Sequence, residues 1–347
     1  MADMVEQADV LVIGGGPGGL ACATVLAEGG ARVILAERKP VIGAKVCAGG
    51  LTRHGMLNYV PDFLIERAFF EQDIQTPWQR VVVTEPEPIA ATVNRERLGQ
   101  WMAEKALAAG VAVLTGTRVM GIEAYCAILE TADGHRSAIK CQHLVGADGS
   151  TSLVRRFLGL PVTNMGIGIN CMHHGIHARM EWHLDPGRFQ AGYGWIFPHQ
   201  DTVSIGVYGD TRLFSARELK QRLLAWAATQ GFVLDSGAIR AGLINYDYRG
   251  VRFGRTWLVG DAAGLASGLT GEGIYPALVS GQTVARMILD PGYVGDELAR
   301  LVAKHRCHDR MTSLAINNRR LRRLLMEGTT MLLRTKIIDF RLLEMAG

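Results

Sequence analysis

Short apolar runs alternate with glycine-rich breaks in the N-terminal part of the chain. An apolar run at residues 9–13 predicts a buried strand, and the alanine- and leucine-rich stretch at about 18–28 predicts a helix. A second apolar run at 31–38 predicts another strand. Strand, helix and strand in this order make a βαβ unit, which indicates a parallel or mixed sheet with helices packed against it.

Two later segments repeat a buried strand that ends in aspartate and glycine. In residues 143–159, HLVGADGSTSLVRRFLG, we expect Ser150 or Thr151 to cap the helix that follows. In residues 256–281 a glycine-rich loop precedes a helix that Gly273 opens. Both segments place a carboxylate at the carboxyl end of a strand, where open α/β sheets bind ligands.

A strand with three aromatic residues is predicted at residues 191–198, AGYGWIFP. Side chains alternate between the two faces of a strand, so Tyr193, Trp195 and Phe197 share one face. The pattern alone is compatible with the core of a sheet or with the wall of a pocket.

The first glycine-rich break has the spacing G-x-G-x-x-G, given by Gly14, Gly16 and Gly19. The first glycine permits a tight turn, the second lets a pyrophosphate approach the backbone, and the third lets the helix pack close to the strand. Glu37 ends the second predicted strand, where a carboxylate accepts hydrogen bonds from ribose hydroxyls. These features predict a dinucleotide site.

The two later carboxylates, Asp148 and Asp261, indicate which dinucleotide binds. Asp261 is placed to accept a hydrogen bond from a ribityl hydroxyl, and the N-terminus of the following helix can stabilise negative charge on a reduced ring system. A flavin therefore fits this pattern.

Composition describes an ordinary globular chain of 347 residues, with 48% hydrophobic and 20% charged residues. The net charge of +4 gives no reason to expect nucleic acid. No run approaches the roughly 18 apolar residues of a membrane span. We expect a cytoplasmic protein with reduced thiols, because its six cysteines are scattered without a C-x-x-C pair, at Cys22, Cys47, Cys126, Cys141, Cys171 and Cys307.

Taken together and in this order, the first glycine loop, ADGSTSLVRR and VGDAAG resemble the FAD-dependent oxidoreductases of the p-hydroxybenzoate hydroxylase fold, over roughly residues 8 to 290. The resemblance implies a Rossmann-like FAD-binding domain and an antiparallel-sheet domain that covers the flavin. It also places Arg95, at the start of a helix, near the FAD; a solvated arginine is the alternative.

Within that fold the chain is most similar to the geranylgeranyl reductase group, which saturates isoprenoid double bonds. Gly264 replaces the histidine of the hydroxylases, and KVCAGGL at 45–51 resembles the segment that this group places beside the flavin. YGWIFP at 193–198 resembles the group's aromatic motif, which favours the pocket wall. Gly268 departs from the group's usual proline.

The resemblance implies FAD as the cofactor and hydride transfer from reduced FAD to an alkene. Only one dinucleotide loop is present, so NAD(P)H or another electron donor would bind transiently. Cys47 and Tyr193 are the candidate catalytic residues, and Tyr193, Trp195 and Phe197 are the candidate substrate-binding residues. The candidate cofactor-binding residues are Gly14, Gly16, Pro17, Gly19, Glu37, Arg38, Cys47, Ala48, Gly49, Arg95, Asp148, Gly260, Asp261, Gly271, Gly273 and Ile274.

We expect a discontinuous FAD-binding domain, a covering domain and a C-terminal helical segment. The respective ranges are 1–60, 90–165 and 250–290 for the first, 61–89 and 166–249 for the second, and 291–347 for the third.

Two features have competing interpretations. In the stretch that holds Cys171, His173, His174, His177 and His183, a strand would place His173 and His177 on the face of Cys171, but the spacing matches no zinc motif, so we expect no metal site.

The C-terminal segment is apolar with interspersed basic residues. It fits a packed helix with a solvated face, or contact with anionic lipid or a prenyl diphosphate. Its basic cluster comprises Arg319, Arg320, Arg322 and Arg323.

Three functions follow from these patterns. The first is reduction of an isoprenoid, geranylgeranyl-type chain. The alternatives are a flavin-dependent monooxygenase or halogenase, and a non-catalytic flavoprotein whose redox state controls partner or membrane binding.

Overall fold

The computed structural model describes residues 5–52 and 59–346. Within that part of the chain, a mainly parallel sheet forms around β1, which pairs in parallel with β11 and β2. A hairpin extends this sheet beside β11. The strands in spatial order are β17 (Arg252–Phe253), β18 (Thr256–Leu258), β11 (Arg136–Gly146), β1 (Val5–Ile13), β2 (Val33–Ala36) and β8 (Ala112–Leu114), with β10 (Cys126–Thr131) and β9 (Thr117–Glu123) added beside β11.

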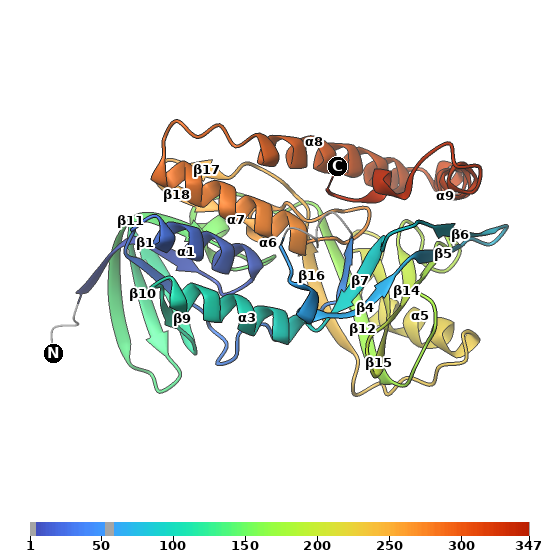
Figure 1. Ribbon diagram of the computed structural model, residues 1–347, viewed down its shortest axis with the longest axis horizontal. Coiled ribbons are helices and arrows are strands. Elements are labelled where there is room, and N and C mark those ends of the chain that lie inside the picture. Colours follow the sequence, from blue (N-terminus) through green and yellow to red (C-terminus); the bar gives the residue numbers. More distant parts are fainter. Residues whose placement is uncertain (1–4, 53–58, 347) are drawn as a thin grey trace.

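Three helices, α1 (Pro17–Glu28), α3 (Arg95–Ala108) and α7 (Ile274–Leu289), lie side by side against this sheet (Figure 1). The α1–α7 contact is close because both helices have glycine where they meet: a β-carbon on Gly281 would overlap the carbonyl oxygen of Gly18. This packing fixes the N-termini of α1 and α7 at the same end of the sheet as the glycine loop.

A second sheet is antiparallel except for the pair β13–β5. Helix α5 (Ala216–Thr229) packs on one of its faces, over apolar side chains of β12 and β15. The other face carries the aromatic residues of β14. The strands in order are β16 (Arg240–Asn245), β12 (Met165–His174), β15 (Thr202–Asp210), β14 (Tyr193–Pro198), β13 (Glu181–His183), β5 (Glu71–Gln75) and β6 (Arg80–Thr84).

Shorter elements connect the two sheets. A small antiparallel sheet comprises β3 (Gly50–Thr52), β7 (Ala90–Val93) and β4 (Ile65–Phe69). Among the described residues before α7, the short helices are η1 (Asp62–Leu64), α4 (Leu153–Phe157) and α6 (Gly260–Ala263). The predicted cap of α4 was wrong by one or two positions: Ser152 is the N-cap and accepts a hydrogen bond from the backbone N–H of Arg155.

The chain ends in helices α8 (Asp296–Asn317) and α9 (Arg319–Arg334), followed by η2 (Phe340–Leu343). Asn318 separates α8 from α9 because its side chain caps the N-terminus of α9. In Figure 1, α8 runs above both sheets toward the β5–β6 hairpin. The predicted α/β fold with an antiparallel covering sheet and a helical C-terminal segment is confirmed.

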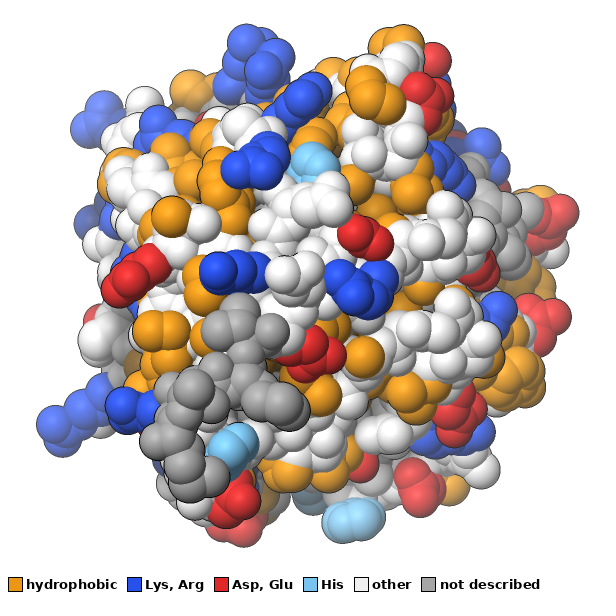
Figure 2. Space-filling view, turned by 90° about the vertical axis from the view of Figure 1, so that its left-hand side faces the viewer, with side chains coloured by type: hydrophobic (Ala, Val, Ile, Leu, Met, Phe, Trp, Pro, Cys, Tyr) orange, Lys and Arg blue, Asp and Glu red, His pale blue; other side chains and the backbone are white. Residues whose placement is uncertain are grey.

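Among the helices of the described residues, none combines the length and apolar character that crossing a bilayer requires. Figure 2 faces the end of the molecule on the left of Figure 1, and basic, acidic and apolar side chains are interspersed there.

Candidate active site

The glycine loop after β1 leaves open space beside its backbone. Gly14 has φ +110°, and a β-carbon there would overlap the Ala147 carbonyl. Gly19 contacts the carbonyl of Gly14 so closely that only glycine fits, which brings α1 against the strand. By contrast, no atom lies within 4 Å of a β-carbon built on Gly16. This is the free approach to the α1 N-terminus that a pyrophosphate needs.

Glu37 follows β2 directly and ties this loop together. Its carboxylate accepts hydrogen bonds from the backbone N–H groups of Gly15 (2.7 Å) and Lys39 (2.9 Å). A carboxylate has about four acceptor positions, so two remain for ribose hydroxyls.

Arg95 opens α3 with a half-buried side chain that lines the cavity. Among the described residues, its Nη1 atom is buried without a hydrogen-bond partner. Burial lowers the pKa of Arg95, and the nearby Asp261 offsets this in part. An unpaired buried cation is costly, so the side chain fits a site for an anion, and the solvated alternative is disfavoured.

Asp148, after β11, also keeps an unpaired buried oxygen. Its Oδ2 atom accepts hydrogen bonds from the backbone N–H groups of Leu153 (2.5 Å) and Val154 (3.3 Å) at the start of α4. Its Oδ1 atom has no partner among the described residues, and burial raises the pKa of the carboxyl. One oxygen thus holds the helix and the other is left for a ligand.

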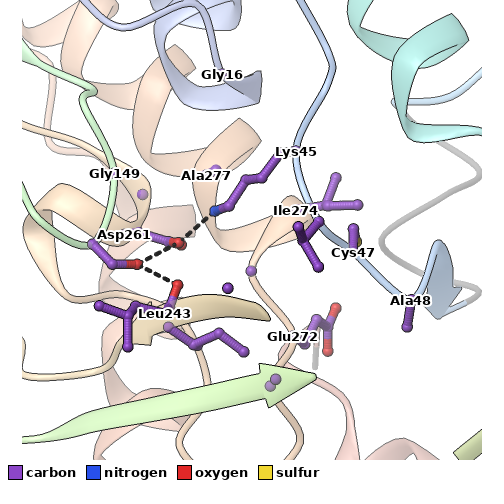
Figure 3. Close-up of a pocket in the computed structure, with 18 of the residues that line it drawn as sticks. Gly16, Lys45, Cys47, Ala48, Gly149, Leu243, Asp261, Glu272, Ile274 and Ala277 are labelled. Carbon is purple, nitrogen blue, oxygen red and sulfur yellow. Dashed lines mark hydrogen bonds and ion pairs between the residues drawn. The ribbon is translucent and has the colours of Figure 1, made fainter. Parts of the chain in front are cut away.

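Asp261, in α6, points toward the same space (Figure 3). Its Oδ2 atom lies 2.8 Å from Lys45 Nζ and 3.1 Å from Ser150 Oγ. The side chain of Asn245 donates to the Asp261 carbonyl at 2.9 Å. Neither Ser150 nor Asn245 was predicted to position this carboxylate.

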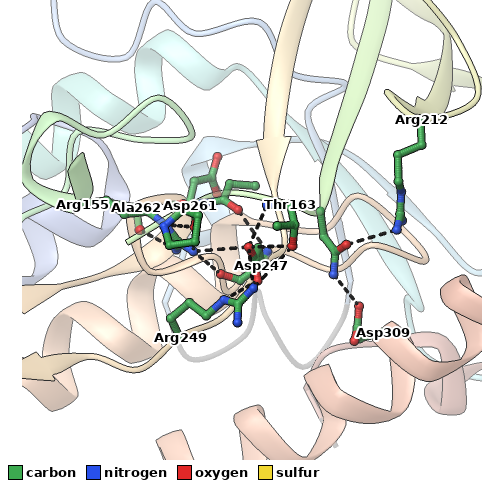
Figure 4. Close-up of polar contacts among 11 residues, drawn as sticks. Arg155, Thr163, Arg212, Asp247, Arg249, Asp261, Ala262 and Asp309 are labelled. Atoms are coloured by element: carbon green, nitrogen blue, oxygen red, sulfur yellow. Dashed lines mark hydrogen bonds and ion pairs between the residues drawn. The ribbon is translucent and has the colours of Figure 1, made fainter. Parts of the chain in front are cut away.

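A polar network behind α6 fixes that segment (Figure 4). The buried guanidinium of Arg155 donates to the carbonyls of Asp247 (2.7 Å) and Ala262 (3.3 Å). The Asp247 carboxylate in turn accepts from Thr163 N and from Arg249 Nε, both at 2.8 Å. This network holds the α6 segment that carries Asp261.

Two departures from the family pattern have a steric reason here. Gly264 has φ +77°, and a β-carbon there would overlap the Asp247 carbonyl. Gly268 lies against the Tyr246 ring, whose nearest atom would be 2.7 Å from a β-carbon. Larger residues therefore do not fit this form of the loop.

The Cys47–Gly49 segment borders the cavity and is held from behind by His199. The ring nitrogens of His199 lie 2.5 Å from Glu66 Oε2 and 3.0 Å from the Ala48 carbonyl oxygen. The thiol of Cys47 accepts a hydrogen bond from Gly49 N at 3.4 Å. The cavity-lining conformation of Cys47 and Ala48 thus depends on a buried histidine outside the predicted site.

Strand β14 contributes an aromatic wall. Tyr193, Trp195 and Phe197 share one face in a single buried cluster, as the alternation predicted. Trp182 from β13 packs on this wall, with ring centroids 4.9 Å from Tyr193 and 5.0 Å from Phe197. The O–H of Tyr193 donates to the Thr270 carbonyl.

The C-terminal helices complete the apolar part of the cavity, a contribution that the sequence patterns did not indicate. Their side chains at the cavity are Met311, Ala315, Arg322, Leu325, Met326, Thr329, Phe340 and Leu343. Arg322 belongs to the predicted basic cluster but is buried, and it donates to the carbonyls of Ala315 and Ile316 at the end of α8. Arg322 therefore does not lie on a solvated basic face, unlike the three other arginines of the cluster.

Glu272, between two glycines at the start of α7, is a further side chain at the cavity that we did not predict. It accepts hydrogen bonds from Thr52 Oγ1 (3.2 Å) and from the backbone N–H of Met345 (3.0 Å). Loss of contact with bulk water raises its pKa to about 7, and the neighbouring Glu344 acts in the same direction. The only sequence signal was a charged residue within a glycine-rich loop.

These groups surround one continuous cavity of about 860 Å³ (Figure 3). The predicted cofactor, substrate and catalytic residues all line it, except Gly19 and Gly49, which lie directly behind the lining. The open glycine backbone, the unpaired Arg95 and the free oxygen of Asp148 fit an extended dinucleotide with an anionic centre. FAD meets these requirements.

The histidine-rich segment does not form a metal site within the described residues. His177 lies beyond the end of β12, so the prediction that it shares a strand face with Cys171 was wrong. Its Nε2 atom lies 2.8 Å from Glu181 Oε1, and Glu181 also contacts His183 at 2.9 Å.

Comparison with known proteins agrees with this geometry. The family described as FAD binding domain matches residues 7–279. The digeranylgeranylglycerophospholipid reductase of Methanocaldococcus jannaschii is 26% identical, covering 83% of this chain and 79% of the relative. The chloroplastic geranylgeranyl diphosphate reductase of Oryza sativa subsp. japonica is 28% identical, covering 81% of this chain and 66% of the relative.

Among solved structures, a geranylgeranyl bacteriochlorophyll reductase-like protein from Thermoplasma acidophilum has the same fold. The TM-score is 0.84 at 20% identity, over 99% of this chain and 96% of the other. The resemblance to the geranylgeranyl reductases is thereby confirmed.

Proposed function

This chain belongs to the FAD binding domain family and is an FAD-dependent oxidoreductase, and from that membership we propose that it reduces carbon–carbon double bonds of an isoprenoid, geranylgeranyl-type chain. The observation that carries the proposal is the continuity of the cavity. It begins at the glycine loop and extends along the aromatic wall to the apolar side chains of α8 and α9.

The lining suits a long hydrocarbon rather than a small polar substrate. The wall of Tyr193, Trp195 and Phe197 is buried and apolar, and methionine and leucine side chains continue it. Such a surface binds an isoprenoid through apolar contact and excludes water. The relatives named for geranylgeranyl compounds support the same substrate class.

When bound, reduced FAD supplies a hydride to one alkene carbon. The residues of the chain then have three tasks. Gly14, Gly16 and Arg95 would bind the diphosphate part of the cofactor, Asp261 would orient its ribityl chain, and the aromatic wall would hold the alkene away from water. Because one dinucleotide loop serves FAD, a nicotinamide donor or another reductant docks transiently.

The outer side of α9 also suits contact with an anionic lipid surface. On α9, Leu324 is 62% exposed and Met331 is 50% exposed. Trp78, in the turn between β5 and β6, is 66% exposed. The Arg323 guanidinium lies 5.5 Å from the Trp78 ring centroid, and Arg320 is exposed on the same helix. Exposed apolar side chains among arginines are typical of interfacial binding.

The inner side of the same helix lines the cavity, through Leu325, Met326 and Thr329. A lipid surface in contact with the outer side of α9 would therefore be separated from the cavity by this one helix.

The test is a single-turnover reaction. The purified flavoprotein is reduced anaerobically and mixed with a geranylgeranyl lipid, and the extracted product is analysed by mass spectrometry. The proposal requires flavin oxidation together with the gain of two hydrogens per reduced double bond. A product that carries oxygen or halogen after O2 is admitted would favour the monooxygenase or halogenase alternative. Lipid affinity that follows flavin redox state, without turnover, would favour the non-catalytic alternative.

A further inference from the structure

We propose that Glu272 is the proton donor of the reduction and that the backbone N–H of Met345 positions it. This inference rests on the proposed function and adds a catalytic residue to it. Glu272 lines the cavity on the loop that leads into α7, a few residues from the helix N-terminus expected beside the flavin.

The hydrogen bonds of the carboxyl identify which oxygen carries the proton. A backbone N–H can only donate, so Oε2, 3.0 Å from Met345 N, is fixed as an acceptor. Thr52 Oγ1, 3.2 Å from Oε1, is a hydroxyl that can donate or accept. The acid proton therefore lies on Oε1, and rotation of the Thr52 hydroxyl accommodates both protonation states.

The surroundings keep this carboxyl protonated in a useful pH range. Burial and Glu344 of the C-terminal segment raise the pKa of Glu272 to about 7, while the Met345 N–H, Thr52 and Lys304 of α8 act in the opposite direction. Among the described residues, the phenols of Tyr193 and Tyr275 also interact with this carboxyl. A general acid works best with a pKa near the operating pH.

The two candidates from the sequence are less suited to this role. The Tyr193 O–H already donates to the Thr270 carbonyl, and burial raises the pKa of the phenol. Cys47 offers a thiol, which is ordinarily a much weaker acid than a carboxyl and therefore a poorer proton donor near neutral pH. Glu272 is the one carboxylic acid among these three, and its Oε1 lies at the cavity beside a Thr52 hydroxyl that can rotate away from the proton.

The reduction adds one hydride and one proton to the double bond. The alkene π bond breaks, one carbon gains a hydride with two electrons from the reduced flavin, and the other carbon gains the proton of Glu272. The flavin is oxidised and the electron donor reduces it again. The carboxylate left on Glu272 regains a proton from solvent.

The experiment uses the full-length FAD-loaded protein with four variants. Glu272→Gln keeps the shape but cannot act as an acid, Met345→Pro removes the positioning N–H, and Met345→Leu keeps it. Glu104→Gln, on the exposed side of α3, is the control for loss of one carboxylate. Each protein is reduced anaerobically and mixed with a geranylgeranyl lipid, and flavin oxidation is followed from pH 5 to 9.

We expect all variants to bind FAD, as the flavin spectrum reports. The wild-type rate should fall as pH rises through about 7, because the acid is lost. Glu272→Gln should be slower by about a hundredfold or more, and without this pH limb. Met345→Pro should oxidise its flavin more slowly than Met345→Leu, and the pH at which its rate falls should shift. Glu104→Gln should match wild type.

The protonation state of Glu272 can also be observed directly, without a rate measurement. Infrared difference spectra of the wild type across the same pH range should contain a protonated carboxyl band that Glu272→Gln lacks. A Glu272→Gln rate within about threefold of wild type, with the same pH profile, would overturn the donor role and leave the proposed function intact. A wild-type protein that reduces no isoprenoid at any pH would overturn both.

Discussion

Lys45 and Asp261, 216 residues apart in sequence, both line the cavity and form an ion pair of 2.8 Å there. Lys45 is half exposed, whereas Asp261 is largely buried. Such a pair contributes little to stability, about 0.2–1 kcal/mol, so its importance lies in where it holds the carboxylate.

We expect Asp261→Asn to lower FAD affinity about tenfold, because a charged acceptor for the ribityl hydroxyls is lost. Lys45→Met should change the free energy of unfolding by less than about 1 kcal/mol and leave Asp261 available. Flavin fluorescence titration and thermal unfolding of the apoprotein measure the two quantities. Loss of affinity in Lys45→Met but not in Asp261→Asn would mean that Lys45, not Asp261, holds the cofactor.

Substitution by alanine at two glycines of the same loop should affect different properties, FAD affinity at Gly16 and apoprotein stability at Gly19. Gly16→Ala fits the fold, because the residue has φ −79° and open space beside it, but the added methyl enters the pyrophosphate region. FAD affinity should fall at least about tenfold with unchanged apoprotein stability. Gly19→Ala should instead destabilise the apoprotein by about 1–3 kcal/mol, because the methyl overlaps the Gly14 carbonyl. Unchanged FAD binding in Gly16→Ala would contradict the site.

Arg95→Met tests the unpaired guanidinium by the sign of its effect. Removing an uncompensated buried charge should raise the stability of the apoprotein by about 1 kcal/mol or more, and should lower FAD affinity by about tenfold to a hundredfold. Arg97→Met, on the exposed side of α3, should change neither. Melting temperatures with and without FAD report both effects, and a destabilised apoprotein would show that Arg95 has a structural partner instead.

The parts of this site that follow from local geometry were predictable from sequence. The glycine loop, the helix that Gly273 opens and the shared face of Tyr193 and Trp195 depend on spacings of a few residues, which the backbone fixes. Contacts between distant segments were not predictable. Glu272 and Met345 are 73 residues apart, and their hydrogen bond exists only because η2 folds back over the cavity.

The predicted cap of α4 was wrong and the burial of Arg322 was not predicted, for a related reason. Ser150 and Ser152 are equally good caps by composition, and tertiary contacts direct Ser150 to Asp261 instead. Arg322 follows two exposed arginines in sequence, but the turn after α8 brings its guanidinium to free carbonyls at that helix end.

The outer side of α9 predicts a charge-dependent interaction with lipid. The double variant Arg320→Glu and Arg323→Glu should lower the affinity for phosphatidylglycerol vesicles, measured by sedimentation, by about thirtyfold or more, since each basic residue near an anionic surface contributes about 1 kcal/mol. Phosphatidylcholine vesicles should bind all proteins weakly. Arg217→Glu, exposed at the start of α5, is the control for charge reversal elsewhere. Equal binding of wild type and the double variant would exclude this surface as the contact.

The raised pKa of Glu272 also predicts how stability depends on pH. Its pKa is 4.5 when unfolded and about 7 in the folded protein, so the folded state binds the proton more tightly. The resulting stabilisation is fully present below pH 4.5 and is lost as pH rises through about 7, by about 3 kcal/mol in total.

Glu272→Gln lacks this ionisation, and its amide fills the same space. The melting temperature of Glu272→Gln minus that of wild type should therefore be larger at pH 8 than at pH 4.5. Both temperatures are measured on apoproteins so that FAD affinity does not contribute. Glu104→Gln, exposed on α3, should give no such pH-dependent difference. If the melting temperatures of wild type and Glu272→Gln differ equally at both pH values, the carboxyl ionises in the folded protein as it does in water, and it could not serve as a proton donor near neutral pH.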